Sequence, residues 1–269
     1  MVARAAKLEE TMSARTRDQA MDDTARRHQG AFFTPAIWVD EAHREIEKAL
    51  GTTWRQDSVV WDPAAGTGNL TRDYTWSSLI SSTLEPDDAA LLVERGWSGR
   101  AFCYDYLNPG PLPSDVDATL RQAALDKKRL VFFLNPPYAA AGNAGTGGTS
   151  KKGVADTAVR KDMHAASLGR PSRQLYAQFM FRSQQLAEQY GFEKVTVALF
   201  CQTGFMCSGS YRKFRDWWYE RFAFKGGFMF QASHFEGVSG RWGVGFTVWS
   251  EGTTDSTKGL VVRLCDVEA

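Results

Sequence analysis

The sequence predicts an α/β protein built on a doubly wound parallel sheet. Short apolar runs, typical of buried strands, alternate with helical patterns from residue 58 to residue 135. This alternation favours a parallel sheet with helices on both faces. Each run ends in a glycine-rich, acidic or proline-rich turn, and such sheets bind ligands at the carboxyl ends of their strands. A chain of 269 residues can bury one sizeable core, so we expect one domain or at most two.

The expected elements follow one another along the chain. Pro35 suits the first turn of a helix, which we expect over residues 36–50, ended by Gly51. Strands are expected at residues 58–61, 79–84, 101–104 and 130–134. Beyond residue 173 we expect an amphipathic helix at 174–190, an apolar strand at 194–200 and a basic-aromatic helix at 211–222. The last expected strands are residues 227–232, 243–249 and 259–265.

The most informative motif is Asn135-Pro136-Pro137-Tyr138, directly after the apolar run at residues 130–134. The prolines fix φ and stiffen the turn, and they leave nearby carbonyls without competing N–H donors. The Asn135 amide oxygen is an acceptor, and Tyr138 adds a flat aromatic face. Together they predict a slot for a planar group that carries an exocyclic amine.

A second motif, Asp62-Pro63-Ala64-Ala65-Gly66-Thr67-Gly68-Asn69, follows the run at residues 58–61. Glycines at a strand-to-helix turn let the backbone approach a ligand closely. No Gly-Lys-Ser/Thr follows, and the full dinucleotide spacing is absent, so the motif is neither a phosphate loop nor a dinucleotide fingerprint.

Acidic side chains end the next two expected strands. Glu85 follows residues 79–84 and can accept hydrogen bonds from ribose hydroxyls. Asp105 follows residues 101–104 and can accept a hydrogen bond from an adenine amino group.

As a set, these motifs resemble those of the S-adenosylmethionine-dependent DNA adenine-N6 methyltransferases. The segment at residues 29–35, which contains Phe33-Thr34-Pro35, is similar to the one that precedes the cofactor loop in that family. The order of this segment, the glycine turn and Asn135-Pro136-Pro137-Tyr138 resembles that of the gamma-type enzymes. The resemblance covers residues 29–249, and it implies a Rossmann-like methyltransferase sheet, mostly parallel, with one antiparallel strand near the C-terminal end.

The resemblance also implies roles for residues. The expected cofactor is S-adenosyl-L-methionine, converted to S-adenosyl-L-homocysteine, with no metal. Its expected binding residues are Phe33, Thr34, Pro35, Asp62, Ala64, Gly66, Gly68, Asn69, Glu85, Asp105 and Asn135. The expected catalytic residues are Asn135, Pro136, Pro137 and Tyr138, and the expected substrate-binding residues are Tyr138, Phe235, Lys151 and Lys152. Trp242 is the nearest rival of Phe235 as a second aromatic wall.

The chemistry of an adenine amine explains the choice of residues. Its lone pair is delocalised into the ring, so an enzyme must favour a pyramidal nitrogen that faces the methyl donor. The Asn135 side-chain oxygen and the Pro136 carbonyl can accept hydrogen bonds from the two N–H groups of the amine. They can thereby stabilise the positive charge that develops on its nitrogen. The base cannot react inside a duplex, so it must flip out and stack on Tyr138.

The segments outside the motifs predict the domain organisation. Residues 1–28, which contain no proline and no glycine, are expected to form a charged helix or arm before the catalytic domain at residues 29–269. Residues 139–173 begin with a glycine-rich stretch and continue with an excess of Lys and Arg, so a flexible basic insertion beside the catalytic turn is expected. No separate target-recognition domain is expected, so specificity would come from a partner chain or a second copy.

Composition excludes some classes of protein. The net charge of +1 gives no global attraction to nucleic acid, so DNA, the expected partner, must be held by local patches. The four cysteines and four histidines show no metal-ligand spacing. No apolar run is long enough to span a bilayer and no signal peptide opens the chain, which favours a cytoplasmic protein without a membrane partner. The resemblance of the motifs also implies a restriction-modification methyltransferase.

Two alternatives stay open at this stage. A protein-glutamine methyltransferase shares the Asn-Pro-Pro-Tyr slot, although such enzymes usually differ in the glycine turn and lack the Phe-Phe-Thr-Pro segment. A non-catalytic cofactor-binding subunit that only recognises DNA is the other, although no catalytic position is visibly degraded. RNA adenine is a further variant of the main interpretation.

Overall fold

The computed structural model describes residues 34–94, 100–138, 156–235 and 242–265. The expected N-terminal arm at residues 1–28 lies outside these ranges, and so do Phe33, Lys151 and Lys152.

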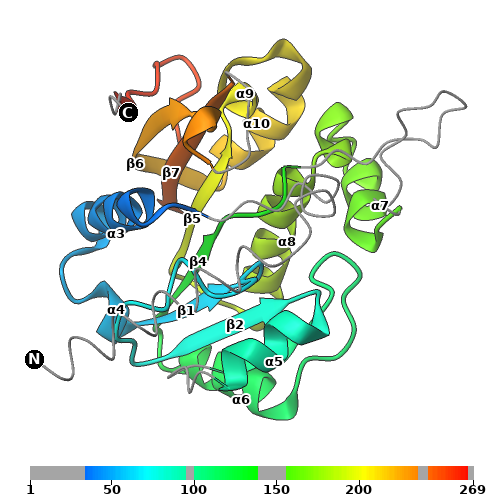
Figure 1. Ribbon diagram of the computed structural model, residues 1–269. Coiled ribbons are helices and arrows are strands. Elements are labelled where there is room, and N and C mark those ends of the chain that lie inside the picture. The colour runs from blue at the N-terminus through cyan, green and yellow to red at the C-terminus, as the bar shows by residue number, and fades with distance from the viewer. Residues whose placement is uncertain (1–33, 95–99, 139–155, 236–241, 266–269) are drawn as a thin grey trace, which may run out of the picture.

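One eight-stranded sheet forms the centre of the protein, in the order β3-β2-β1-β4-β5-β7-β6-β8 (Figure 1). β7 runs antiparallel to both of its neighbours, and every other pairing is parallel. The predicted fold class, including the antiparallel strand near the C-terminal end, is therefore confirmed. The strands are β1 (Ser58–Asp62), β2 (Leu79–Thr83), β3 (Arg100–Cys103), β4 (Arg129–Leu134), β5 (Val195–Gln202), β6 (Phe222–Gln231), β7 (Gly243–Glu251) and β8 (Arg263–Leu264).

Helices cover both faces of the sheet (Figure 1). Alternate strand residues feed two separate cores, because successive side chains of a strand point to opposite faces. Trp61 and Phe132 pack with α6, α7 and α8, whereas Val60 and Phe133 pack with α3 and α4. The helices are α3 (Ala36–Leu50), α4 (Trp54–Asp57), α5 (Pro86–Glu94), α6 (Ser114–Leu125), α7 (Ala158–Ala165), α8 (Leu175–Tyr190), α9 (Gly204–Cys207) and α10 (Arg212–Tyr219), with 3-10 turns η1 (Arg170–Arg173), η2 (Gly209–Tyr211) and η3 (Ala232–His234).

The first expected helix has the predicted bounds. Pro35 precedes α3, and Gly51 ends it with φ of 91°, donating its N–H to the carbonyl of Glu47. The positive φ explains why glycine occupies that position.

The basic segment at residues 139–173 differs from expectation over the part that the structure describes. Residues 158–165 form α7 and residues 170–173 form η1, instead of a flexible loop. The Thr157 side chain caps α7 by accepting from the Arg160 N–H, and Val159 and Met163 are fully buried at helical spacing. Two buried apolar side chains four residues apart thus outweigh the polar composition of the segment.

The hairpin of β6 and β7 begins earlier than predicted. β6 starts at Phe222 rather than residue 227, and α10 ends at Tyr219. The register shifts between Phe224 and Gly226. A Cβ atom on Gly227 would lie 2.3 Å from the Phe246 carbonyl oxygen, so the two backbones approach there as only glycine allows.

Candidate active site

Asn135 follows the last residue of β4 and is held on both sides of its amide. Its Nδ2 donates to Thr34 Oγ1 at 2.8 Å, and its Oδ1 accepts from the Tyr138 hydroxyl at 2.8 Å. Thr34 is buried just before α3. The structure therefore joins the segment before the glycine turn to the Asn-Pro-Pro-Tyr turn.

Tyr138 lies in an aromatic group at the same edge of the sheet. Its ring centroid is 6.1 Å from that of Phe235 and 5.3 Å from that of Trp242. Both candidates for the second aromatic wall thus contact it, one from the end of β6 and the other from the start of β7. Burial raises the pKa of the Tyr138 phenol well above its ordinary value, so the hydroxyl remains a neutral donor.

The glycine turn follows β1 in the expected position. Gly66 and Gly68 have φ of 50° and 83°, a region that favours glycine. The Ala65 N–H donates to the Ser82 carbonyl and the Gly68 N–H donates to the Ala65 carbonyl. These bonds fix the loop between the ends of β1 and β2.

Several buried polar atoms around this turn make no hydrogen bond within the described residues. They are Asp62 Oδ2, Thr67 Oγ1, Asn69 Oδ1 and Ser81 Oγ. Buried polar groups normally have partners, and exceptions are frequent where a ligand binds. A carboxylate, two hydroxyls and an amide oxygen are suited to a ligand rich in N–H and O–H donors, such as the amino-acid and ribose parts of S-adenosylmethionine. Sequence analysis missed Ser81, although β1–β2 pairing places it directly beside Asp62.

The Asp62 carboxyl is fully buried. Burial raises its pKa from 3.8 to about 7, and the hydrogen bond from the Ala64 N–H opposes that change. A cationic ligand beside Oδ2 would favour the charged carboxylate.

Glu85 and Asp105 follow the ends of β2 and β3, and β2 lies between β1 and β3 in the sheet. Glu85 is exposed, and its backbone carbonyl accepts from Ala89 as α5 begins. Asp105 Oδ1 accepts from the N–H groups of Leu107 and Asn108, and Oδ2 accepts from the Asn108 side chain. Asp105 therefore organises its own turn, and Oδ2 retains capacity for one further donor.

A buried histidine fixes α3 against the loop after β1. His43 Nε2 lies 2.9 Å from the Leu70 carbonyl oxygen, so it donates there, and Nδ1 lies 3.2 Å from Arg55 Nη1. The His43 ring stacks on Tyr74 at 3.4 Å between centroids. Burial, above all, lowers the pKa of His43 to about 3. Because α3 begins beside Thr34, this contact also positions the partner of Asn135.

Two arginines of the basic segments at residues 139–173 and 211–222 have structural partners. Arg160, 16% exposed, pairs with Asp156 at 3.3 Å. Arg215, on α10, donates to the carbonyls of Phe205 and Ser208. Both side chains therefore hold the local fold and are poorly placed for phosphate.

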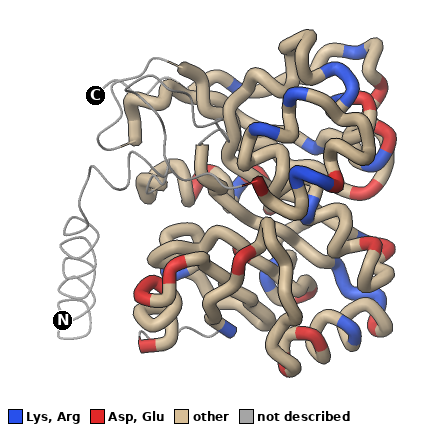
Figure 2. Tube along the Cα trace, turned by 90° about the vertical axis from the view of Figure 1, so that its right-hand side faces the viewer, with Lys and Arg blue, Asp and Glu red and all other residues tan. Residues whose placement is uncertain are grey.

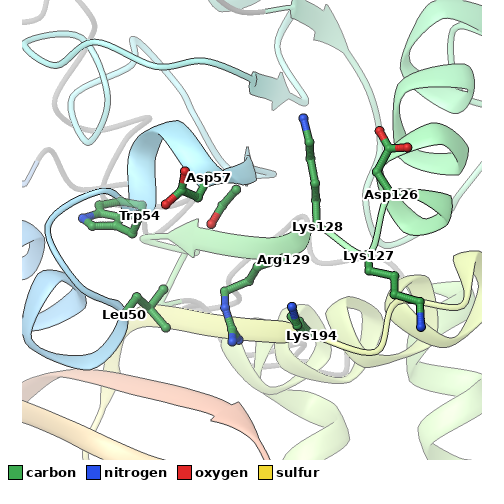
Figure 3. Close-up of a pocket in the computed structure, with 9 residues that line it drawn as sticks. Leu50, Trp54, Asp57, Asp126, Lys127, Lys128, Arg129 and Lys194 are labelled. Atoms are coloured by element: carbon green, nitrogen blue, oxygen red, sulfur yellow. The ribbon is translucent and has the colours of Figure 1, made fainter.

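A pocket of about 290 Å³ lies at the opposite edge of the sheet, where β1 and β4 begin (Figure 3). Its position, far from the carboxyl ends of the strands, separates it from the predicted site. Its lining residues are Leu50, Trp54, Asp57, Ser58, Asp126, Lys127, Lys128, Arg129 and Lys194.

Within the described ranges, no cluster of three or more His, Cys, Asp or Glu is placed to hold a metal ion. No helix in the same ranges is long and apolar enough to cross a membrane.

Comparison with known proteins shows the fold. No protein-family model and no curated protein sequence matches the chain. Among solved structures, this chain is similar to a modification subunit of a putative type I restriction enzyme from Vibrio vulnificus YJ016, with 16% identity and a TM-score of 0.56. The match covers 94% of this chain and 50% of that chain. A putative class I S-adenosylmethionine-dependent methyltransferase from Listeria monocytogenes is also similar, with 12% identity and a TM-score of 0.55. That match covers 88% of this chain and 65% of that chain.

A nuclease-deletion mutant of the Type ISP restriction-modification enzyme LlaGI, in complex with a DNA substrate mimic, gives 12% identity over 88% of this chain and a TM-score of 0.61. The chain covers 27% of that protein and 29% of the chain in the DrdV–DNA complex, which it matches with a TM-score of 0.55. It thus spans well under two thirds of these longer proteins. At such identities the likeness concerns the fold alone: the chain has the α/β fold that S-adenosylmethionine-dependent methyltransferases use.

Proposed function

We propose that this protein transfers a methyl group from S-adenosylmethionine to the N6 amine of adenine in DNA. The observation that carries the proposal is the Asn135 amide, fixed at the end of β4 by Thr34 and flanked by the Tyr138 ring. The fold it shares with restriction-modification enzymes solved with DNA or a DNA substrate mimic supports the same function.

The cofactor site is proposed around the glycine turn. Asp62, Thr67, Asn69 and Ser81 offer buried polar atoms there that form no hydrogen bond with any residue the structure describes, and Ala64, Gly66 and Gly68 allow close backbone approach. Glu85 and Asp105 are proposed to take the ribose and the adenine amine, and Thr34 and Pro35, with Phe33 before them, the amino-acid end. When bound, S-adenosylmethionine supplies an electrophilic methyl group on a positively charged sulfur.

The residues of the Asn-Pro-Pro-Tyr turn are proposed to activate the amine. Asn135 Oδ1 accepts one N–H of the adenine amine, and the Pro136 carbonyl accepts the other. Both acceptors stabilise the positive charge that develops on the nitrogen during methyl transfer. The proton leaves after transfer, so positioning rather than a strong base supplies the rate.

Tyr138 must move before a base can enter. Its hydroxyl occupies Asn135 Oδ1, the acceptor that the adenine amine needs. The Tyr138 and Phe235 centroids are 6.1 Å apart and the rings are tilted by 53°. A base between two aromatic faces needs about 7 Å, twice the 3.4 Å stacking distance of nucleic acids. We propose that the incoming base displaces the Tyr138 hydroxyl and stacks on its ring.

Product analysis tests the proposal. The protein is incubated with genomic DNA and isotope-labelled S-adenosylmethionine, and the DNA is digested to nucleosides for mass analysis. Labelled N6-methyl-2′-deoxyadenosine in the DNA digest is the expected product, and it should be lost in Asn135→Ala. N4-methylcytosine, methylated glutamine in added protein or methylation of RNA alone would refute the DNA-adenine assignment. One protein with this fold is a modification subunit of a putative type I restriction enzyme, and we propose that a partner chain or a second copy likewise supplies sequence specificity here.

A further inference from the structure

A group of exposed cations lies beyond the carboxyl end of β5, next to the proposed catalytic turn. We call it the basic ridge; its members are Arg170 and Arg173 of η1 and Arg212 and Lys213 of α10. All four side chains are exposed. Within the described ranges, Arg170, Arg173 and Lys213 have no ion pair, and Arg212 lies 3.8 Å from Asp216 at 81% exposure.

The topology places this ridge beside Asn135. Leu134 of β4 pairs with Leu199 of β5, so Asn135 lies level with Phe200. β5 continues only to Gln202, and α9, η2 and α10 follow at once. In Figure 1, α9 and α10 lie at this end of β5. The ridge and the catalytic turn therefore share one edge of the sheet.

Packing holds the two halves of the ridge together. η1 packs against η2, and the Tyr176 ring, just after η1, stacks on Tyr211 at 6.3 Å and 9° between planes. The two carbonyl contacts of Arg215 fix the turn that precedes α10. The cations thus stand on ordered helical turns, although η1 and α10 are far apart in the sequence.

The charge of the ridge distinguishes it from neighbouring surfaces. Figure 2 looks onto the side that carries α7, α8 and α10, where Lys and Arg segments are mixed with Asp and Glu. Asp156, just before α7, pairs with Arg160, and Asp162 on α7 accepts from Gln185. In η1 and α10 only Asp216 opposes the four cations. Ser208 and Ser210, whose hydroxyls lie 3.0 Å apart beside Arg212 in the sequence, add further donors for phosphate oxygen.

We propose that the basic ridge binds the phosphates of the DNA strand beside the flipped adenine. This inference rests on the proposed function. Phosphate contacts give affinity and register without reading sequence, and each one removed lowers the slope of log affinity against log salt by about 0.9. The ridge would therefore hold the strand against the catalytic edge while specificity comes from elsewhere.

The test compares two triple variants of the full chain. One is Arg170→Ser, Arg173→Ser and Lys213→Ser. The matched control, Lys127→Ser, Lys128→Ser and Lys194→Ser, removes the same charge from the opposite edge of the sheet (Figure 3). DNA binding is measured by fluorescence anisotropy with a mixed-sequence 30-base-pair duplex and S-adenosylhomocysteine, from 50 to 200 mM salt. A duplex RNA of the same sequence is the second probe.

The ridge variant is expected to bind DNA more weakly than wild type at low salt. Raising the salt from 50 to 200 mM should then weaken its binding by a factor about 40 times smaller than for wild type, because three phosphate contacts are gone. Its cofactor affinity and Tm should match those of wild type, and the control should keep the wild-type slope. A ridge variant with the wild-type slope, a control that flattens equally, or a ridge effect seen with RNA alone would overturn the inference. Product analysis separates the two proposals. If wild type methylates adenine in DNA but the ridge variant keeps the wild-type salt slope, only the proposal that the basic ridge binds phosphate is refuted.

Discussion

The buried Asp62 carboxyl should destabilise the cofactor-free protein at neutral and alkaline pH. Its pKa is 3.8 in an ordinary environment and about 7 in the fold, because burial penalises the charged form. As pH rises, Asp62 therefore loses its proton first in the unfolded chain, and the contribution of Asp62 to folding stability falls between about pH 4 and pH 7. Above pH 7 the loss is complete. A gap of about three pH units corresponds to roughly 4 kcal/mol, an upper limit.

Asp62→Asn removes this penalty and keeps an oxygen to accept from the Ala64 N–H. At pH 8 the variant should unfold at a Tm several degrees higher, since 1 kcal/mol shifts Tm by about 2–4 °C in chains of similar size. The gain should shrink as pH falls and vanish near pH 4. Affinity for S-adenosylmethionine should fall at least tenfold, because the amide carries no charge for the cofactor ammonium.

Thermal unfolding from pH 4 to pH 8.5, with calorimetric titration of the cofactor, measures both effects. The control is Asp126→Asn, an exposed aspartate at the end of α6, which should change neither. A variant that is less stable than wild type at pH 8, or a gain in Tm that does not depend on pH, would refute the reasoning.

Three further predictions concern the site. Asn135→Ala should lower the methyl-transfer rate about a hundredfold or more with nearly unchanged cofactor affinity; near-normal turnover in single-turnover assays would contradict its role. Tyr138→Phe keeps the stacking ring but removes the hydroxyl that donates to Asn135 Oδ1, so kcat/KM should stay level or rise up to about fivefold, the worth of a bond of about 1 kcal/mol; a tenfold fall would show that the hydroxyl assists the reaction. The His43 pKa of about 3 lies below its ordinary 6.5, so the contribution of His43 to folding stability is fully present above pH 6.5 and is lost as pH falls towards 3, opposite in sign to that of Asp62. His43→Gln, which can still donate to the Leu70 carbonyl, should flatten that loss in urea titrations at pH 4 and pH 7; an unchanged loss would exclude His43 as its source.

Sequence patterns predicted the parts of the fold that depend on local chemistry. The helix at Ala36–Leu50 has the predicted bounds because Pro35 and Gly51 mark its ends. The glycine turn follows β1 and Asn135 follows β4, because apolar runs and turn residues determine where buried strands stop.

The remaining features depend on contacts between distant residues. No local pattern indicates that the Tyr138 hydroxyl takes the Asn135 acceptor, or that Thr34, 101 residues away, takes its donor. The His43–Tyr74 stack is likewise invisible until α3 docks on the loop after β1. β6 was predicted to begin at residue 227 because its paired glycines weaken the strand signal, although they permit the close approach to β7.

That close approach also limits how this protein can evolve. Because a Cβ at Gly227 would meet the Phe246 carbonyl oxygen at 2.3 Å, any other residue there must push β6 and β7 apart. The same hairpin carries Phe235 and Trp242 where β6 connects to β7, and both rings lie close to Tyr138. A saturation screen for activity would therefore score position 227 as intolerant as Asn135, although it touches no substrate. Intolerance at this position would report the spacing of two backbones rather than chemistry.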